Sequence, residues 1–362
     1  MIRRTLRWVA SAVALSIAAA GPAAAHVDYV TDETAPGTVG ELFAAVFSSP
    51  VALALLGGGG VAVAAVTLGY LRFSGSLLDI EVARRTLASY RPYLPWMLRL
   101  SIGLPLVGAG FAGYLFSPSV PVNARLLQVG IGFVLLFGLA TRIAALVGLV
   151  TYAWALAGQF PELLLAGEYV AGFLAIFLIG PGQPSADMML RRMVATEGTI
   201  LSRFQGLPKP EDVLSALGLT PAAAPVALRV FLGANFIYLG VVQKWFQPEQ
   251  AAAVVAKYDL TAVVPVSPEL WVFGAGLTEA AVGVLLLTGT LTRGAAAAAF
   301  VILTTTLFGL PDDPVLAHVT LFGLSSALMV TGASGFSVDE AVVPALRNRL
   351  GVGGDVTERP ST

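Results

Sequence analysis

The chain has 362 residues, of which 56% are hydrophobic and only 12% charged, and its mean hydropathy is +0.81. These values exclude an ordinary water-soluble domain, which needs more charge on its surface, and predict an all-α polytopic membrane protein in the lipid bilayer. A net charge of −1 without a basic, aromatic-rich cluster excludes nucleic acid as a partner. The absence of cysteine excludes disulfide exchange, iron–sulfur clusters and cysteine-ligated zinc.

Residues 1–25 have the pattern of a secretory signal peptide. Three arginines precede an apolar run, and small residues follow it as far as Ala25. We expect cleavage after Ala25, with an uncleaved anchor helix as the alternative. Cleavage would leave His26 at the N-terminus, where its amine and ring nitrogens could chelate copper. Because no second ligand lies nearby, an ordinary exposed N-terminus is favoured, and we predict no metal site.

Nine further stretches are long and apolar enough, or nearly so, to cross a bilayer core of about 30 Å at about 1.5 Å per residue. They are Phe43–Tyr70, Leu98–Phe116, Leu126–Ala140, Ile143–Leu156, Leu163–Ile179, Ala223–Val242, Leu270–Thr288, Gly294–Leu310 and Val315–Thr331. The first is a lead-in helix, and its run Gly57–Gly60 predicts close helix packing rather than a phosphate loop, because no lysine follows in register.

The other eight stretches form two sets of four that carry the same motifs. Leu98-Arg99 with Gly103 and Gly110 recurs 130 residues later, Gly138-Leu-Ala-Thr141-Arg142 recurs after 151, and Gly180…Ser185-Ala-Asp187 recurs after 152. We therefore predict two tandem four-helix bundles, the second with extra residues at Gln247–Ser267. An even helix count returns the chain to its starting side, so the bundles should be parallel about the membrane normal.

This organisation predicts six segments and an orientation. The segments are a signal peptide (1–25), an extracytoplasmic lead-in with the first span and an amphipathic cytoplasmic loop (26–97), the first unit (98–190), a cytoplasmic linker (191–222), the second unit (223–342) and a cytoplasmic tail (343–362). With the N-terminus outside, fifteen lysines and arginines lie inside and three outside. That asymmetry fits the positive-inside rule and predicts a cell-membrane protein with a cytoplasmic C-terminus.

Placing a charged side chain inside the bilayer costs about 2.5 to 3.5 kcal/mol, so each charged residue in the spans of the second unit is expected to have a structural or functional role. Glu279 shares a helix face with glycines three and four residues away, so it should point at a neighbouring helix. Lys244 is its expected partner, because a buried carboxylate is either paired or protonated. The equivalent residues of the first unit are Tyr114 and Gln128. The loss of both charges together is what pairing predicts.

Two interpretations of this pair stay open. It fastens two helices, or it lines a site for a quinone ring, with Glu279 moving protons and Lys244 or His318 donating hydrogen bonds to the carbonyl oxygens. His318 also has the simpler interpretation of a satisfied hydrogen-bonding group. Tyr238 and Thr305 would complete the lining of a quinone site.

Other polar residues have structural explanations. Ser337 is expected to cap a short helix with Glu340 as its capping-box partner, and the aspartate two residues after each motif serine favours the positive end of that helix. The arginine of each Gly-x-x-Thr-Arg motif is an expected orientation anchor. Glu168 of the first unit is a buried acid without an obvious partner.

Together these motifs resemble the DoxX family, which includes DoxD-like membrane subunits. The residues that carry the resemblance are Arg229 with Gly233, Gly240-Val-Val-Gln-Lys244, Glu279, Gly289-Thr-Leu-Thr292-Arg293 and Gly335-Phe-Ser337-Val-Asp339. The first unit looks like the same module without the charged pair. The resemblance implies a four-helix membrane module and, for the DoxD branch, the membrane subunit of a thiosulfate:quinone oxidoreductase. Two fused modules behind a signal peptide depart from the single-module pattern, so we do not carry over the substrate.

Three functions follow as hypotheses. The leading one is a redox-linked membrane subunit that handles quinone in the outer half of the second unit. Because no cofactor motif is present, its electrons must come from a partner redox subunit or a small donor. The second is a non-catalytic scaffold or assembly factor for a redox complex. The third is a small-solute transporter, which the parallel repeats favour but which lacks matching interrupted spans in the two halves.

Overall fold

The computed structural model describes residues 35, 37–73, 78–122, 125–206 and 208–341. The α-helices are α2 (Val39–Ser48), α3 (Pro50–Phe73), α4 (Leu78–Ser89), α5 (Leu94–Ala112), α6 (Arg125–Phe137), α7 (Thr141–Gly158), α8 (Glu168–Ile179), α9 (Ala186–Ala195), α10 (Pro210–Ala216), α11 (Ala224–Ile237), α12 (Pro248–Lys257), α13 (Leu260–Val263), α14 (Pro268–Thr288), α15 (Thr292–Gly309), α16 (Val315–Thr331) and α17 (Val338–Ala341). Short 3₁₀ turns are η1 (Arg91–Tyr93), η2 (Glu162–Ala166), η3 (Ile200–Phe204) and η4 (Pro221–Ala223), and η5 (Tyr238–Phe246) is a π-helix. The predicted signal peptide, His26 and the predicted tail lie outside the described residues.

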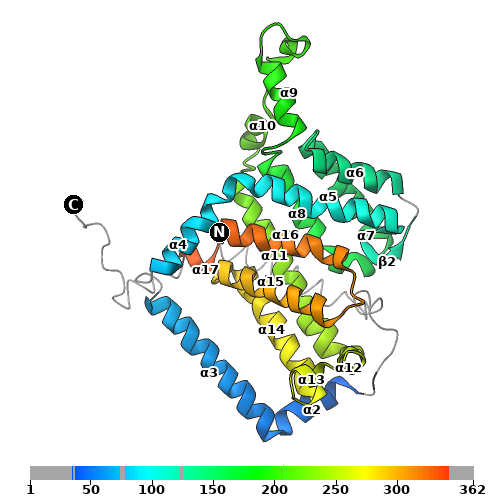
Figure 1. The fold of residues 1–362 in the computed structure, drawn as a ribbon, viewed down its shortest axis with the longest axis vertical. Helices are drawn as coiled ribbons and strands as arrows, with labels where there is room; N and C mark the ends of the chain where they lie inside the picture. Colours follow the sequence, from blue (N-terminus) through cyan, green and yellow to red (C-terminus); the bar gives the residue numbers. More distant parts are fainter. Residues whose placement is uncertain (1–34, 36, 74–77, 123–124, 207, 342–362) are drawn as a thin grey trace, which may run out of the picture.

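Two four-helix bundles form the body of the protein (Figure 1). In the first, α5, α6, α7 and α8 each pack against the next, and α8 closes the ring on α5. In the second, α11, α14, α15 and α16 make the same sequence of contacts. The bundles meet where α5 packs on α16 and α8 packs on α11. The all-α architecture is confirmed, whereas a tandem duplication as its origin stays a prediction.

Seven helices of the described chain are long and apolar enough to cross a membrane. The shorter apolar helices α6 and α16, with 13 and 17 residues, complete the two bundles. The protein is therefore a polytopic membrane protein, and the count of nine spans stays a prediction. Below, the pair end is the end of the bundles that holds Lys244 and Glu279, and the arginine end is the one that holds Arg99 and Arg229.

The predicted first span is two helices rather than one. Ser49 has extended backbone angles between α2 and α3 because it precedes Pro50, which disfavours helical geometry in the preceding residue. The short helix α2 packs against α14, while α3 lies apart from the bundles (Figure 1). The prediction of close packing at Gly57–Gly60 is wrong within the described chain, since a Cβ added at any of these glycines would meet nothing within 4 Å.

The first unit has a hairpin at its pair end that the hydropathy pattern did not predict. Helix α5 stops at Ala112, four residues before the expected end, because Gly113 takes left-handed backbone angles with φ of 85°. The chain then forms the antiparallel strands β1 (Tyr114–Leu115) and β2 (Ser117–Pro121). The same place in the second unit continues as η5, so the two units differ most at this end.

At the arginine end, an aspartate of each unit caps a helix other than its own. Asp187 accepts hydrogen bonds from the backbone N–H groups of Ala140 and Thr141 at 2.6 and 2.8 Å, at the start of α7. Asp339 binds the start of α15 in the same way, at 2.7 and 2.9 Å from two N–H groups. As expected, each aspartate also lies in the first turn of the helix after its own motif serine, at the positive end of that helix. The serine caps the same helix, since Ser337 accepts a hydrogen bond from the Glu340 N–H at 3.3 Å.

Two buried arginines hold the loops at this end. Arg229 donates to the carbonyl oxygens of Leu287, Gly335 and Phe336, at 2.6 to 3.2 Å. Arg99 donates to the carbonyl oxygen of Pro184 at the equivalent place in the first unit. The predicted anchors also bind carbonyl groups here. Arg142 donates to Phe177 of α8 and Arg293 to Val330 of α16, at 2.9 and 3.2 Å.

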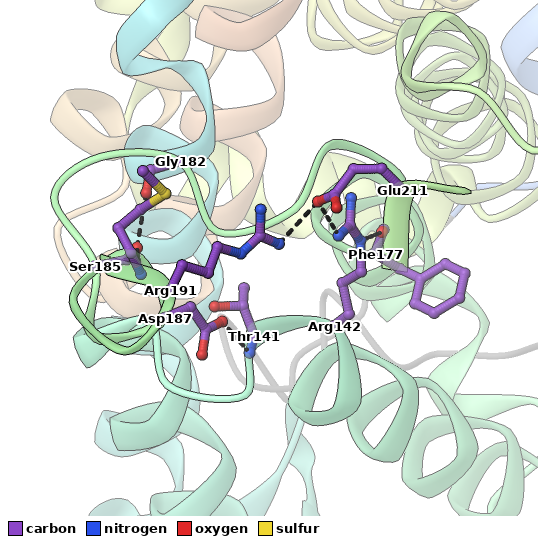
Figure 2. A network of polar contacts seen from close by, with 9 residues as sticks. Thr141, Arg142, Phe177, Gly182, Ser185, Asp187, Arg191 and Glu211 are labelled. Atoms are coloured by element: carbon purple, nitrogen blue, oxygen red, sulfur yellow. Dashed lines mark hydrogen bonds and ion pairs between the residues drawn. The ribbon is translucent and has the colours of Figure 1, made fainter. Parts of the chain in front are cut away.

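Figure 2 shows an ionic cluster at the arginine end of the first unit, where Arg142 and Arg191 both point at Glu211 of α10. Each arginine lies 2.8 Å from the same carboxylate oxygen. Burial acts to raise the pKa of Glu211, but the hydrogen bonds from Arg142 and Arg191 outweigh it and lower the pKa to about 2. The cluster therefore attaches α10 to the first bundle.

This cluster predicts that the attachment of α10 weakens in acid. The pKa of Glu211 is lower in the folded protein than in the unfolded chain. Its ion pairs therefore stabilise the attachment of α10 fully at a pH above the unfolded pKa of about 4.3, and this stabilisation is lost as the pH falls towards the folded pKa of about 2. Since 43% of the Glu211 side chain is exposed, solvent screening limits the effect to about 1 kcal/mol. Pepsin cleavage of residues 186–216 should accelerate across this range in the wild type. In Glu211→Gln, the cleavage rate should already be high at the upper end of this pH range and should change only as the activity of pepsin itself changes. An identical dependence of the cleavage rate on pH in both proteins would contradict the prediction.

Candidate functional site at the pair end of the second unit

The site begins with an unusually close approach between α11–η5 and α14. Gly233 faces Gly283, and Gly240 faces Gly276. A Cβ added at Gly240 would lie 2.4 Å from the carbonyl oxygen of Gly276, and one added at Gly233 would lie 2.7 Å from that of Gly283. Small residues of this kind let helix backbones touch where lipid supplies no hydrophobic drive between helices. Glu279 of α14 is therefore held against η5.

The π-helix η5 carries the other half of the pair. It spans nine residues, Tyr238–Phe246, and continues α11 at the place where the first unit ends its helix at Gly113. Segments of π-helix are rare, and they occur frequently at functional sites because the wider turn redirects side chains. Here η5 packs against α14 and brings Lys244 to Glu279.

The predicted contact between Lys244 and Glu279 is present. The Lys244 Nζ lies 2.9 Å from Oε1 and 2.7 Å from Oε2 of Glu279, so one ammonium bridges both carboxylate oxygens. The Lys244 side chain is 23% exposed and that of Glu279 is 11% exposed. The pair is thus largely buried but open at one edge.

The first unit makes the equivalent contact without charge. Gln128 is the counterpart of Glu279 and Tyr114 that of Lys244, and the Gln128 Nε2 donates to the Tyr114 carbonyl oxygen at 3.3 Å. The first unit therefore joins α6 to strand β1 at this place without a charged pair.

An aromatic cluster covers the pair end beside Lys244. The Trp245 ring stacks on Phe273 of α14 at a centroid distance of 5.3 Å, and its Nε1 donates to the Phe273 carbonyl oxygen at 3.2 Å. Helix α2 adds Phe43, 6.0 Å from Trp245, and Phe47, 5.6 Å from Phe273. This contact explains why α2 separates from α3, since it lies across the bundle end instead of continuing the span.

Three buried polar side chains of η5 and its C-cap have atoms without a hydrogen-bond partner in the described structure. They are the Tyr238 hydroxyl, the Gln243 Nε2 and the Gln247 Oε1. Gln243 is only 2% exposed, and buried polar groups are normally hydrogen-bonded. Sequence reasoning missed both glutamines, although two amides beside Lys244 in an otherwise apolar stretch were an available signal.

His318 lies in a second ion-pair arrangement. Its Nε2 is 3.4 Å from the Asp313 Oδ2, its Nδ1 is 3.2 Å from the Pro314 carbonyl oxygen, and both side chains are 2% exposed. Burial raises the pKa of Asp313, and the nearby His318 acts against that rise. Asp313 was not predicted from the sequence as the partner of His318.

The neighbouring Asp312 has a different role. It lies 3.0 Å from Lys257 Nζ and accepts a hydrogen bond from the Tyr258 hydroxyl at 2.8 Å. These contacts from the Lys257 ammonium and the Tyr258 hydroxyl lower the pKa of Asp312. Asp312 therefore joins the turn before α16 to the inserted segment of the second unit, which forms α12 and α13.

The two residues expected to complete a quinone lining lie on different elements, Tyr238 on η5 and Thr305 on α15. Tyr238 packs with Val242 and with Leu165 of the first unit. Thr305 is exposed, and its hydroxyl donates to the carbonyl oxygens of Val301 and Ile302 in its own helix. Its neighbour Thr304 instead lines an apolar pocket of about 510 Å³ between α15 and α16. The other lining residues are Phe300, Leu307, Phe308, Val315 and Phe322.

Glu168 has a partner after all, across the junction of the two units. The Asn235 Nδ2 donates to the Glu168 Oε2 at 3.2 Å and to the Leu165 carbonyl oxygen at 2.7 Å. The sequence could not reveal this contact because the two residues lie in different bundles.

A comparison with known protein families gives a match in the second bundle. The family model described as DoxX matches residues 224–312, from the start of α11 to the turn before α16. No curated protein and no solved structure gives a significant match. The matched range includes Gly240, Lys244 and Glu279, so the helix junction with the charged pair lies in the part of this membrane protein that is similar to the DoxX family.

Proposed function

We propose that the second unit binds the headgroup of a quinone at the Lys244–Glu279 pair, as the membrane subunit of a redox system. The two electrons that convert a quinone to a quinol would come from a partner subunit or a small donor, since the chain has no cysteine. The two protons would pass through the carboxyl group of Glu279, and Lys244 would donate a hydrogen bond to a quinone oxygen.

The comparison between the units carries this proposal. In the first unit the counterpart of Lys244 lies in strand β1 rather than in a helix, and a neutral hydrogen bond between Gln128 and Tyr114 takes the place of the charged pair, so that bundle closes there without charge. An ion pair in the same place costs desolvation, and ionisable residues within a membrane mark functional sites by default. The unpartnered Gln243 Nε2 on the same helical segment adds a donor for a polar ligand.

The proposal predicts that neutralising the pair removes quinone binding and leaves the fold intact. The wild type and Lys244→Met/Glu279→Gln would be purified in detergent, and each would be titrated with a short-chain ubiquinone analogue while tryptophan fluorescence is followed. We expect at least a tenfold loss of affinity, because hydrogen bonds to a charged group are worth about 1.5 to 3 kcal/mol. Quinone extracted from the preparations should fall in parallel.

Lys257→Gln/Asp312→Asn is the matched control, because it removes an exposed ion pair from the same end of the same unit. It should bind the analogue like the wild type. Equal binding by the wild type and the neutral pair would refute the proposal and favour the scaffold interpretation, in which the pair only fastens two helices. A wild type without affinity for the analogue would refute quinone binding altogether.

A further inference from the structure

Three arginines from separate elements converge on the end of α16. Arg84 comes from α4, Arg91 from η1 and Arg293 from the first turn of α15. Arg91 and Arg293 donate to the carbonyl oxygens of Thr331 and Val330, at 3.5 and 3.2 Å. The positive charges of Arg84 and Arg91 lie close enough to Arg293 to repel its guanidinium group. Arg84 also donates a hydrogen bond to the Tyr70 hydroxyl. We call these residues the arginine cluster.

The cluster has no acidic partner among the residues that the structure describes. The equivalent place in the first unit is neutralised in part, because Glu211 pairs with both Arg142 and Arg191. The carbonyl end of α16 offers only about half a negative charge against three cations. The Arg293 Nε is buried and has no hydrogen-bond partner in the described chain. The geometry therefore leaves an excess of positive charge and an unused donor.

The surroundings place this excess at a membrane surface. Helix α4 presents Leu78 and Val82 to the outside, with 74% and 52% of each exposed, next to its charged residues. An amphipathic helix of this kind lies in the boundary between headgroups and acyl chains. Figure 1 shows α4 between the end of α3 and the bundle, where it packs on α16. A ligand of the cluster would therefore lie at the level of lipid headgroups.

We propose that the arginine cluster binds the phosphate of an anionic phospholipid headgroup, with the Tyr70 hydroxyl as a further polar contact. Guanidinium groups match phosphate oxygens with paired hydrogen bonds. A lipid would suit the site better than a soluble anion, because its acyl chains would lie along the apolar surface of α3. That surface is exposed, since only 6% of the membrane-spanning stretch of α3 is buried inside the protein. The site lies at the opposite end of the bundle from Lys244 and Glu279 and is independent of quinone binding.

The test measures the thermal stability of the full chain in detergent during titration with dioleoylphosphatidylglycerol, dioleoylphosphatidylcholine or inorganic phosphate. The wild type should be stabilised by phosphatidylglycerol alone. For Arg84→Gln/Arg91→Gln the concentration for half the shift should rise about twenty-five-fold, at about a factor of five per arginine. Arg91→Gln alone, which alters an exposed side chain with one long hydrogen bond, should show about a fivefold rise even if the double variant folds poorly.

Arg85→Gln/Arg203→Gln is the charge-matched control. Arg85 lies next to Arg84, but its side chain is 79% exposed and pairs with Glu81 at 2.7 Å. This control should keep the wild-type titration. Equal stabilisation by phosphatidylcholine, or equal losses in the control and the cluster variants, would overturn the proposal. An arginine-dependent shift with inorganic phosphate that matches the lipid would overturn the lipid assignment in favour of a soluble phosphate ligand.

Discussion

Gly240→Ala is expected to separate η5 from α14 and to lower the free energy of unfolding by about 3 kcal/mol or more. The added methyl group would lie 2.4 Å from the Gly276 carbonyl oxygen and 2.7 Å from the Ala280 nitrogen. Both are backbone atoms, so no side-chain rotation can relieve the clash. The helices must move apart, and the movement would lengthen the contact between Lys244 and Glu279. Denaturation in mixed detergent micelles, followed by circular dichroism, measures the change.

Gly58→Ala provides the matched control in α3. A Cβ at Gly58 would meet nothing within 4 Å, and alanine favours a helix over glycine by about 1 kcal/mol. We therefore expect this variant to be as stable as the wild type or slightly more stable. Equal stability of Gly240→Ala and Gly58→Ala would show that the approach of η5 to α14 is looser than the structure indicates.

The features that follow from local chemistry were predictable from the sequence. Apolar runs predicted the helices of both bundles, and the recurring motifs lie at matching places in the two bundles. The glycine-lined face of α14 indicated that Glu279 would point at a neighbouring helix, and Lys244 is its partner there. Each of these inferences uses residues within one helix or one repeated spacing.

The features that the sequence did not reveal depend on contacts between distant elements. Asp187 and Asp339 cap α7 and α15, which precede them by more than forty residues. A rule for local helix ends placed them in the first turns of α9 and α17 but could not reveal this second role. Hydropathy does not distinguish a helix end from a hairpin, so the turn at Gly113 was missed. The pairing of Glu168 with Asn235 depends on how two bundles dock, which no periodicity encodes.

Removing one partner of the central pair should cost more than removing both. Lys244→Met leaves the Glu279 carboxylate, only 11% exposed, without a cation, and we expect a loss of about 2 to 3 kcal/mol in the free energy of unfolding. Glu279→Gln should cost about 1 kcal/mol, because Lys244 is 23% exposed and its long side chain can carry the ammonium to water. The cost should therefore be asymmetric.

The double variant Lys244→Met/Glu279→Gln should lose only about 1 kcal/mol, since the new amide can donate to the carbonyl oxygen of residue 244, as Gln128 donates to Tyr114 in the first unit. The double-mutant cycle would then give a coupling energy of about 2 kcal/mol. Detergent denaturation of the four proteins measures it. A coupling near zero, in which the double variant is as unstable as the sum of the two single variants, would contradict the prediction, because it would mean that Lys244 and Glu279 stabilise the fold independently rather than as an ion pair.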